Sequence, residues 1–224
     1  SENYFATAKV NGQLTAPADA AGAANGVYTY GPSGGFPSST FNQSNYFVDV
    51  VFNPGSTPPP PATQSLFASS DTPTTITQND GQSVELGVKF TSSAAGTITG
   101  IRFYKGPQNV GTHQARLWNA AGTVLATATF SAETASGWQE VLFTTPVSIT
   151  AGTTYVASYH TGGFYSINAN YFATARTNGV LTAPSSATSG GNGVYAYGAT
   201  PAFPNQTFNA SNYWVDVIFQ SPTS

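Results

Sequence analysis

The residues that could carry out catalysis are few in this chain of 224 residues. It has two histidines, His113 and His160, and no cysteine. Glu133 and Glu140 flank Trp138 and form the best carboxylate pair, because glycoside hydrolases hold two carboxyl groups about 5 to 9 Å apart. We expect Glu133 to be solvated in its turn-like stretch, so the sequence predicts a protein that is not an enzyme.

Several side chains with oxygen atoms that could bind a metal ion lie around residues 83–91, the first strand predicted below. Asp71, Asp80 and Glu85 lie there, with Asn79 next to Asp80. Carboxylate and amide oxygens are the ligands that Ca²⁺ prefers in proteins. The alternative is that these side chains accept hydrogen bonds from the backbone of tight turns. The sequence therefore predicts no cofactor, except that a structural calcium ion could bind at Asp71, Asp80 and Glu85.

Aromatic rings beside carboxylates form a third candidate site, because a flat ring can stack on a sugar while an acid accepts its hydroxyl groups. If Val215 points inward along a strand, Trp214 and Asp216 point outward. The carbohydrate-binding residues predicted in this way are Trp214, Asp216, Trp118, Phe47 and Asp49. The alternative, which the sequence favours, is that a Gly-rich loop covers this face and packs on Trp214. The covering residues would be Tyr195, Tyr197 and Phe203.

The elements that must position these residues are β-strands. Only 7% of the residues are charged, and short runs of Val, Ile, Phe and Tyr are separated by Gly, Pro, Ser, Thr and Asn. No stretch has a helical period. The predicted strands span 83–91, 97–104, 112–119, 123–130, 138–144, 153–160 and 213–219. We expect an all-β fold, an antiparallel β-sandwich that is jelly-roll-like and part of a tandem-repeat array.

Two details of this sandwich follow from the alternation of apolar residues. The four apolar residues of 83–91 share one face of their strand and should line the core. Ile98 and Ile101 cannot both face inward unless a β-bulge lies near Gly100.

The tandem array is inferred from an internal repeat. A shift of 167 positions aligns residues 1–52 with residues 168–219 without a gap, and 31 of the 52 aligned pairs are identical. A run of prolines between the copies favours a semi-rigid polyproline II spacer. The predicted domains are the C-terminal third of a preceding repeat (1–53), a linker (54–64), a complete module (65–220) and the start of the next linker (221–224).

Residues 1–52 would supply only the closing strands of a module. Val48, Val50 and Phe52 align with predicted core residues of the complete copy, so without a partner they would lie in water. We therefore predict that these three side chains pack between modules. The predicted partners are copies of this chain or neighbouring repeats, joined head to tail.

A series of motifs in the complete copy resembles a known family. The motifs are Val84–Phe90, Gly100–Gly106, Arg116–Trp118, Ala135–Gln139, Tyr155–His160, Asn192–Tyr195 and Asn212–Val217. In this order they resemble domain of unknown function 4082 over about Leu66–Phe219. The resemblance implies a secreted or cell-surface bacterial protein, often repeated or joined to glycoside hydrolases, and it implies no activity.

Two functions remain open at this point. The first is a non-catalytic extracellular structural or adhesive repeat of a fibre-like protein, and the alternative is a carbohydrate-binding module that binds polysaccharide for secreted glycan-degrading enzymes. A net charge of -3 offers no cationic face to nucleic acid. No apolar stretch reaches the roughly 20 residues that cross a membrane. We expect the chain to be part of a longer polypeptide.

Overall fold

The computed structural model describes residues 1–19, 24–32, 34–52 and 63–222. The chain divides into two compact units, Ser1–Thr57 and Pro58–Ser224, which we call the N-terminal and C-terminal units. Most of the predicted proline-rich linker, residues 54–62, lies outside the described residues, as do residues 223–224 of the predicted second linker. In the described parts of both units, no helix has the length and apolar character needed to cross a membrane.

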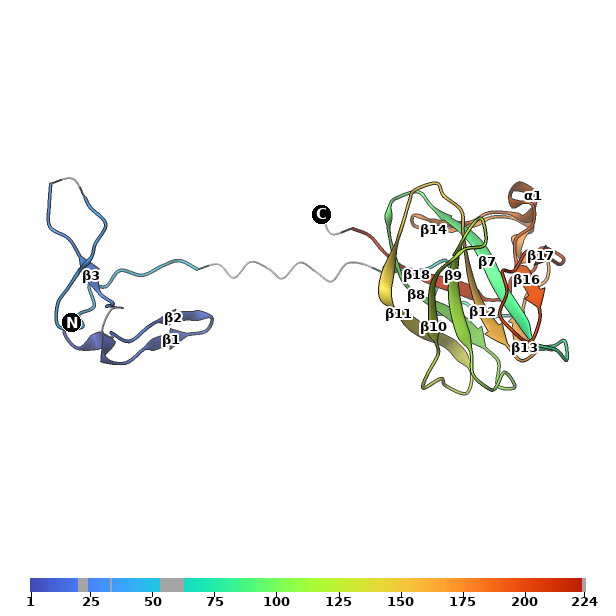
Figure 1. Cartoon of the computed structure of the whole chain (residues 1–224), viewed down its shortest axis with the longest axis horizontal. Coiled ribbons are helices and arrows are strands. Elements are labelled where there is room, and N and C mark those ends of the chain that lie inside the picture. Colours follow the sequence, from blue (N-terminus) through green and yellow to red (C-terminus); the bar gives the residue numbers. More distant parts are fainter. Residues whose placement is uncertain (20–23, 33, 53–62, 223–224) are drawn as a thin grey trace. The chain divides into compact units, whose positions relative to one another are not determined.

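The C-terminal unit is built from antiparallel strands (Figure 1). They are β5 (Thr63–Gln64), β6 (Thr75–Asn79), β7 (Val84–Ser92), β8 (Gly96–Lys105), β9 (Gln114–Asn119), β10 (Val124–Thr129), β11 (Gly137–Ile149), β12 (Tyr155–Thr161), β13 (Phe164–Ile167), β14 (Arg176–Asn178), β15 (Leu181–Ala183), β16 (Val194–Tyr197), β17 (Gln206–Thr207) and β18 (Val215–Gln220). Two short helices, η2 (Tyr171–Ala173) and α1 (Ser186–Ser189), complete the unit. The seven predicted strands are confirmed as β7 to β12 and β18. The short strands that were not predicted have two to five residues, which is too few to show a clear alternation.

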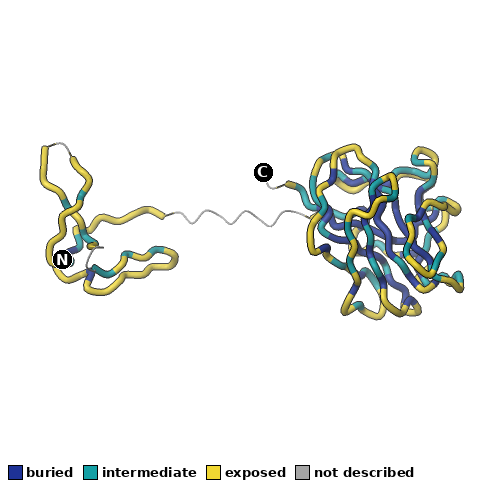
Figure 2. Tube along the Cα trace, in the orientation of Figure 1, coloured by how far each residue is buried: buried dark blue, intermediate teal, exposed yellow. Residues whose placement is uncertain are grey.

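Two sheets form the C-terminal unit. One has the order β11-β8-β18-β5, and the other has the order β10-β9-β12-β7-β15-β14, with β16 pairing the first half of β7 and also β17. A separate two-stranded antiparallel sheet pairs β6 with β13. The sheets pack against each other in a sandwich-like arrangement, and Phe103 of one stacks on Tyr159 of the other with ring centroids 4.1 Å apart. Figure 2 shows the buried residues concentrated along these strands.

The apolar alternation predicts the core of the C-terminal unit correctly. The apolar residues of β7 all belong to the core, as expected from their shared face. Ile98 and Ile101 are both fully buried, and the register of β8 shifts between them against both of its neighbours. The predicted bulge is therefore confirmed.

The N-terminal unit has little regular structure. Its elements are η1 (Tyr4–Ala6), β1 (Lys9–Asn11), β2 (Leu14–Ala16), β3 (Val27–Tyr28) and β4 (Ser39–Thr40), and the strands form two hairpins. Among its described residues only Phe5 and Ser44 are buried. The unit therefore has no hydrophobic core of its own (Figure 2).

Several described turns of residues 1–52 nevertheless have the same backbone conformation as the aligned turns of residues 168–219. The helical turns η1 and η2 each follow an asparagine in the left-handed conformation, Asn3 (φ 56°) and Asn170 (φ 58°). The backbone amides of these asparagines donate to aligned carbonyls of the two segments, both at 2.8 Å. The hairpins β1–β2 and β14–β15 have matching registers.

A pair of aligned glycines shows why this local structure is specified in both segments. Gly26 and Gly193 have φ values of 71° and 73°, which favour glycine. A Cβ atom at either position would lie 1.7 or 1.6 Å from the carbonyl oxygen of Ser44 or Ser211. Each glycine thus allows its own turn to contact the backbone of the turn that contains Ser44 or Ser211. This contact forms in both units, although only the C-terminal unit has a core.

Candidate functional site

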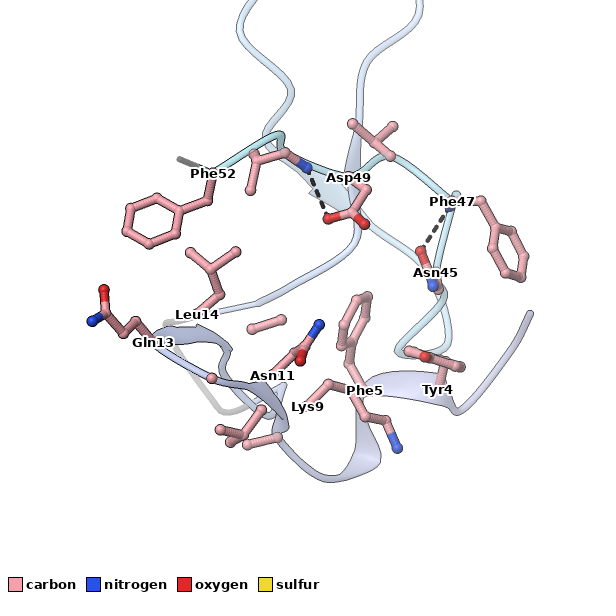
Figure 3. A pocket seen from close by; sticks show the side chains of 16 residues that line it. Tyr4, Phe5, Lys9, Asn11, Gln13, Leu14, Asn45, Phe47, Asp49 and Phe52 are labelled. Carbon is pink, nitrogen blue, oxygen red and sulfur yellow. Dashed lines mark hydrogen bonds between the residues drawn. The ribbon is translucent and has the colours of Figure 1, made fainter. Parts of the chain in front are cut away.

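The N-terminal unit carries a hollow surface lined by both apolar and polar side chains, which we call the open face (Figure 3). It is formed by η1, the β1–β2 hairpin and residues 45–52, around a cavity of about 1180 Å³. The apolar side chains that line it include Phe5, Leu14, Phe47, Val48, Val50 and Phe52. Val48 is 88% exposed and Val50 is 66% exposed. Large apolar side chains that are exposed close together indicate an interaction site.

The aligned residues of the C-terminal unit lie in the middle of a sheet. Strand β18 pairs with β8 along one edge and with β5 along the other. Val215, Val217 and Phe219 are all fully buried there. Residues 46–52, in contrast, form no strand in the described structure. What residues 1–52 lack is therefore a segment equivalent to residues 63–167, which contains β5 and β8.

A buried ion pair holds β18 in place. The carboxylate of Asp216 is fully buried and accepts hydrogen bonds from Arg102 Nε at 3.0 Å and Nη2 at 2.8 Å. The backbone amides of Leu66 and Phe67 also donate to it, at 2.7 and 3.1 Å. Burial raises the pKa of the Asp216 carboxyl, while Arg102 and the two amides act to lower it. All of these donors come from the segment that residues 1–52 lack.

Asp49 occupies the same position on the open face without these donors. It accepts a hydrogen bond from the backbone amide of Val50 at 2.8 Å, as Asp216 does from Val217 at 2.7 Å. No other hydrogen bond to Asp49 is found among the described residues. The open face therefore presents a carboxylate whose counterpart in the C-terminal unit is neutralised by an arginine.

The predicted carbohydrate-binding residues of the C-terminal unit are buried. Trp214 is 2% exposed, Trp118 is 5% exposed and Asp216 is fully buried, so the expectation that they form an exposed platform is wrong. The reason lies partly in the backbone, because Trp214 has φ 56° and precedes β18, so strand alternation does not set its direction. Phe47 and Asp49 are exposed, but they belong to the open face.

The loop expected to cover Trp214 packs on Trp118 instead, through Phe203. Phe203 packs on Trp118, with ring centroids 5.6 Å apart, and Ser158 accepts a hydrogen bond from its indole nitrogen at 2.7 Å. Trp214 does not contact the predicted loop tyrosines. The rings around it are Phe67, Tyr104, Trp138 and Tyr171.

The predicted calcium ligands do not meet. Asp71 pairs with Arg176 at 2.8 Å, and Glu85 accepts from the Ser158 hydroxyl at 2.5 Å. Asp80 accepts from two tyrosines, Tyr165 and Tyr197. In the described part of the chain no three acidic, histidine or cysteine side chains are grouped for a metal ion. The calcium prediction is therefore wrong in its geometry, because Asp71 and Asp80 lie outside the two ends of β6, Glu85 lies in β7, and each has its own partner.

The two carboxylates considered for glycoside hydrolysis, Glu133 and Glu140, have different partners and different exposure. Glu133 is not solvated as expected, because its side chain is only 10% exposed and contacts Lys105 at 2.7 Å and His113 at 2.8 Å. Glu140 is largely exposed, with its carboxylate 3.8 Å from Arg102. Burial lowers the pKa of His113, and Glu133 opposes this shift. The absence of enzymatic activity stays a prediction.

Two functional features were missed from the sequence. Arg102 could have been suspected, because a lone arginine lies inside the apolar stretch of β8 and Asp216 lies inside that of β18. The grouping of Asp80 with tyrosines from β13 and β16 carries no local signal, because these residues are far apart in the chain.

The described residues define an all-β protein whose antiparallel sheets pack against each other in a sandwich-like arrangement. The sequence model of the family described as Domain of unknown function (DUF4082) matches residues 1–48 and 70–215, and the chain belongs to this family. The match is a single one over nearly the whole chain, so it does not itself separate a complete copy from a fragment. A search of curated proteins found no match.

Proposed function

We propose that this chain is a non-catalytic structural repeat of an extracellular bacterial fibre or surface protein, and that repeats join head to tail through the open face. In this proposal residues 65–220 are one complete jelly-roll-like module, and residues 1–53 are the C-terminal third of a preceding one. The secreted location rests on the family resemblance of the motifs. Because no acid pair or nucleophile is arranged for catalysis among the described residues, we propose no reaction.

The proposal rests on a difference in burial between residues 46–52 and the aligned residues 213–219, which belong to segments with the same turns. Val48, Val50 and Phe52 are exposed where their counterparts in β18 are fully buried. Burying such side chains is worth roughly 1.5–3 kcal/mol each. An unpaired strand edge adds backbone donors and acceptors that another strand can satisfy. Residues 1–52 therefore gain several kcal/mol from a partner that supplies the missing strands.

The charge on the open face restricts what this partner can be. Burying Asp49 beneath an apolar partner would cost several kcal/mol, because an unpaired carboxylate would lose its hydration. A partner with an arginine placed like Arg102, and with free amides placed like those of Leu66 and Phe67, would instead neutralise it. The partner is thus best matched by another copy of the segment 63–167.

A count of complementary segments favours a neighbouring repeat over exchange within identical chains. Residues 1–224 contain two closing segments, 1–52 and 168–219, and one accepting segment, 63–167. In the C-terminal unit residues 168–219 already occupy that accepting segment. Exchange between copies would therefore always leave one closing segment uncovered. We infer that residues 1–52 complete a module whose accepting segment belongs to an adjacent repeat.

The test supplies the missing segment. In an extended polypeptide, a second copy of residues 63–167 is fused to the N-terminus of the 224-residue chain. This copy then precedes residues 1–52 just as the original precedes residues 168–219. Hydrogen exchange followed by NMR then measures the amides of residues 46–52. We expect them to exchange freely in the 224-residue chain and to become protected by at least about 100-fold in the extended one.

The matched control replaces the added copy of Arg102 by methionine. We expect this change to weaken the new protection, and Asp49→Asn to do the same only in the extended polypeptide. The proposal is wrong if residues 46–52 stay unprotected after the extension. It is also wrong if they are already protected in the monomeric 224-residue chain. Protection of residues 46–52 in an oligomer of that chain, together with loss of protection in β18, would indicate exchange between copies and would also contradict the proposal.

A further inference from the structure

A second cavity lies in the C-terminal unit, and Asp80 is the one predicted site residue among the described residues that line it. We call it the tyrosine cleft. It measures about 490 Å³ and lies between the paired strands β6 and β13, β16 and the approach to β18. The side chains used below are Gln78, Asp80, Tyr165, Tyr195, Tyr197 and Phe208. Val84 and Leu86 of β7 contribute apolar surface to it and are almost fully buried, so the cleft rests on the rigid core of the unit.

A single carboxylate organises the polar part of the tyrosine cleft. Asp80 Oδ2 accepts hydrogen bonds from the hydroxyl of Tyr165 at 2.8 Å and from that of Tyr197 at 2.6 Å. The hydrogen bond to Asp80 raises the pKa of Tyr197 to about 12, and burial raises that of Tyr165, so both hydroxyls stay protonated at neutral pH. Among the described residues no hydrogen bond to Asp80 Oδ1 is found. Together with the amide of Gln78, this oxygen is available to a ligand.

The apolar part of the cleft consists of aromatic rings held by one another. Tyr195 contacts Tyr197 edge to face at 5.3 Å, and Tyr165 contacts the buried Tyr213 at 5.8 Å. At the rim, Tyr197 is 41% exposed and Phe208 is 57% exposed. Exposed aromatic rings beside fixed polar groups are typical of ligand sites, since the rings provide contact area and the polar groups provide orientation.

We propose that the tyrosine cleft binds a neutral saccharide. A pyranose ring has an apolar face of C–H groups, which suits Tyr197 and Phe208, and hydroxyl groups that can donate to Asp80 and exchange hydrogen bonds with Gln78. A divalent cation is a poorer match, because Asp80 is the only carboxylate that lines the cleft. A proline-rich peptide is also poorer, because proline has no N–H to donate to Asp80.

The N-terminal unit contains the aromatic half of this cleft without its carboxylate. Tyr28 and Tyr30 align with Tyr195 and Tyr197, and their rings are likewise 5.3 Å apart. Asp80 belongs to the segment that residues 1–52 lack. Tyr30 is therefore a matched control: it is the same residue type in the same local structure, and it is 91% exposed. The saccharide site is complete within the C-terminal unit and does not depend on the function proposed for the open face.

The test titrates the full chain with four neutral hexasaccharides built from glucose (β-1,4), xylose, mannose and N-acetylglucosamine. Binding is followed by NMR chemical shifts and by calorimetry. We expect at least one of them to shift resonances of Tyr197 and Phe208. Tyr197→Ala and Phe208→Ala should each weaken its binding about tenfold, because each removes a stacking ring. Tyr30→Ala should leave the affinity unchanged.

Two variants keep this test interpretable. Phe208 is mostly exposed, so Phe208→Ala should fold normally, and its unperturbed spectrum away from the cleft confirms that. Asp80→Asn keeps the size of the side chain and should weaken binding several-fold. The proposal is overturned if none of the four saccharides shifts the cleft resonances at millimolar concentration. It is equally overturned if a peptide with the sequence of residues 57–62 shifts them at lower concentration than any saccharide.

Discussion

Residues 1–52 and 168–219 share 31 of 52 residues and the same local turns, and yet their strand-forming ends differ completely in burial. The asparagines before η1 and η2, the glycines at 26 and 193 and the two short hairpins have matching geometry in both. In contrast, residues 46–52 form no strand, whereas β18 is paired on both edges. The comparison indicates that turns are determined by the segment itself, while a strand forms only where a neighbour pairs with it.

Removing the last core ring should give the largest difference between the two segments. Phe219→Ala leaves a cavity in the packed core and should lower the free energy of unfolding of the C-terminal unit by about 3–5 kcal/mol. Phe52→Ala should change it by less than about 0.5 kcal/mol, because Phe52 has no core around it. Urea unfolding followed by tryptophan fluorescence measures this, since all three tryptophans lie in the C-terminal unit. Equal losses in the two variants would contradict the comparison.

The aligned aspartates should differ almost as much. Asp216→Asn leaves the Arg102 guanidinium buried without its counter-charge and should cost about 3 kcal/mol in the same urea experiment. Asp49→Asn should cost less than about 0.5 kcal/mol, since Asp49 is exposed. Replacing both Arg102 and Asp216 by apolar residues should recover part of the loss, because no charge is then left unpaired. A large effect of Asp49→Asn in the 224-residue chain would show that the open face is already occupied.

The aligned glycines, unlike the aligned phenylalanines and aspartates, should be equally important for the turns of both segments. A Cβ atom at Gly193 or at Gly26 would overlap a backbone carbonyl oxygen, and both residues have positive φ. Gly193→Ala should therefore destabilise the C-terminal unit by about 2 kcal/mol. Gly26→Ala should abolish the turn between residues 26 and 44, seen as a loss of the NMR contacts between them. If Gly26→Ala leaves those contacts intact, the local structure of residues 1–52 is not set by the glycine.

The smallest expected difference concerns the dependence of stability on pH. It should appear only in the C-terminal unit, which contains both histidines. Burial lowers the pKa of His113 below its ordinary value of 6.5, so the unfolded chain binds a proton that the folded one does not. The stability of the C-terminal unit should be complete above pH 6.5 and fall as the pH drops below it. His113→Gln should reduce this dependence. The NMR signals of residues 1–52 should not change in that range.

Part of the candidate sites could be predicted from sequence, and part could not. Asp49 and Asp216 were selected because each lies two residues after an aromatic ring on the predicted outward face. The role of Asp216 was misassigned, because Arg102, which neutralises it, lies 114 residues away in the sequence. Glu133 is a similar case, since its turn-like neighbours suggested solvent and its partners come from elsewhere in the chain.

The sequence by itself determined the all-β character, the places of the seven longer strands, the bulge near Gly100 and the turns that recur in both segments. These depend on side-chain alternation and on backbone preferences, which act over a few residues. Only the tertiary structure decided that Trp214 is enclosed by four aromatic rings, that the predicted metal ligands have separate partners and that Asp80 meets Tyr165 and Tyr197. Each of these contacts joins side chains that are far apart in the sequence, and strand pairing, which no local pattern encodes, brings them together.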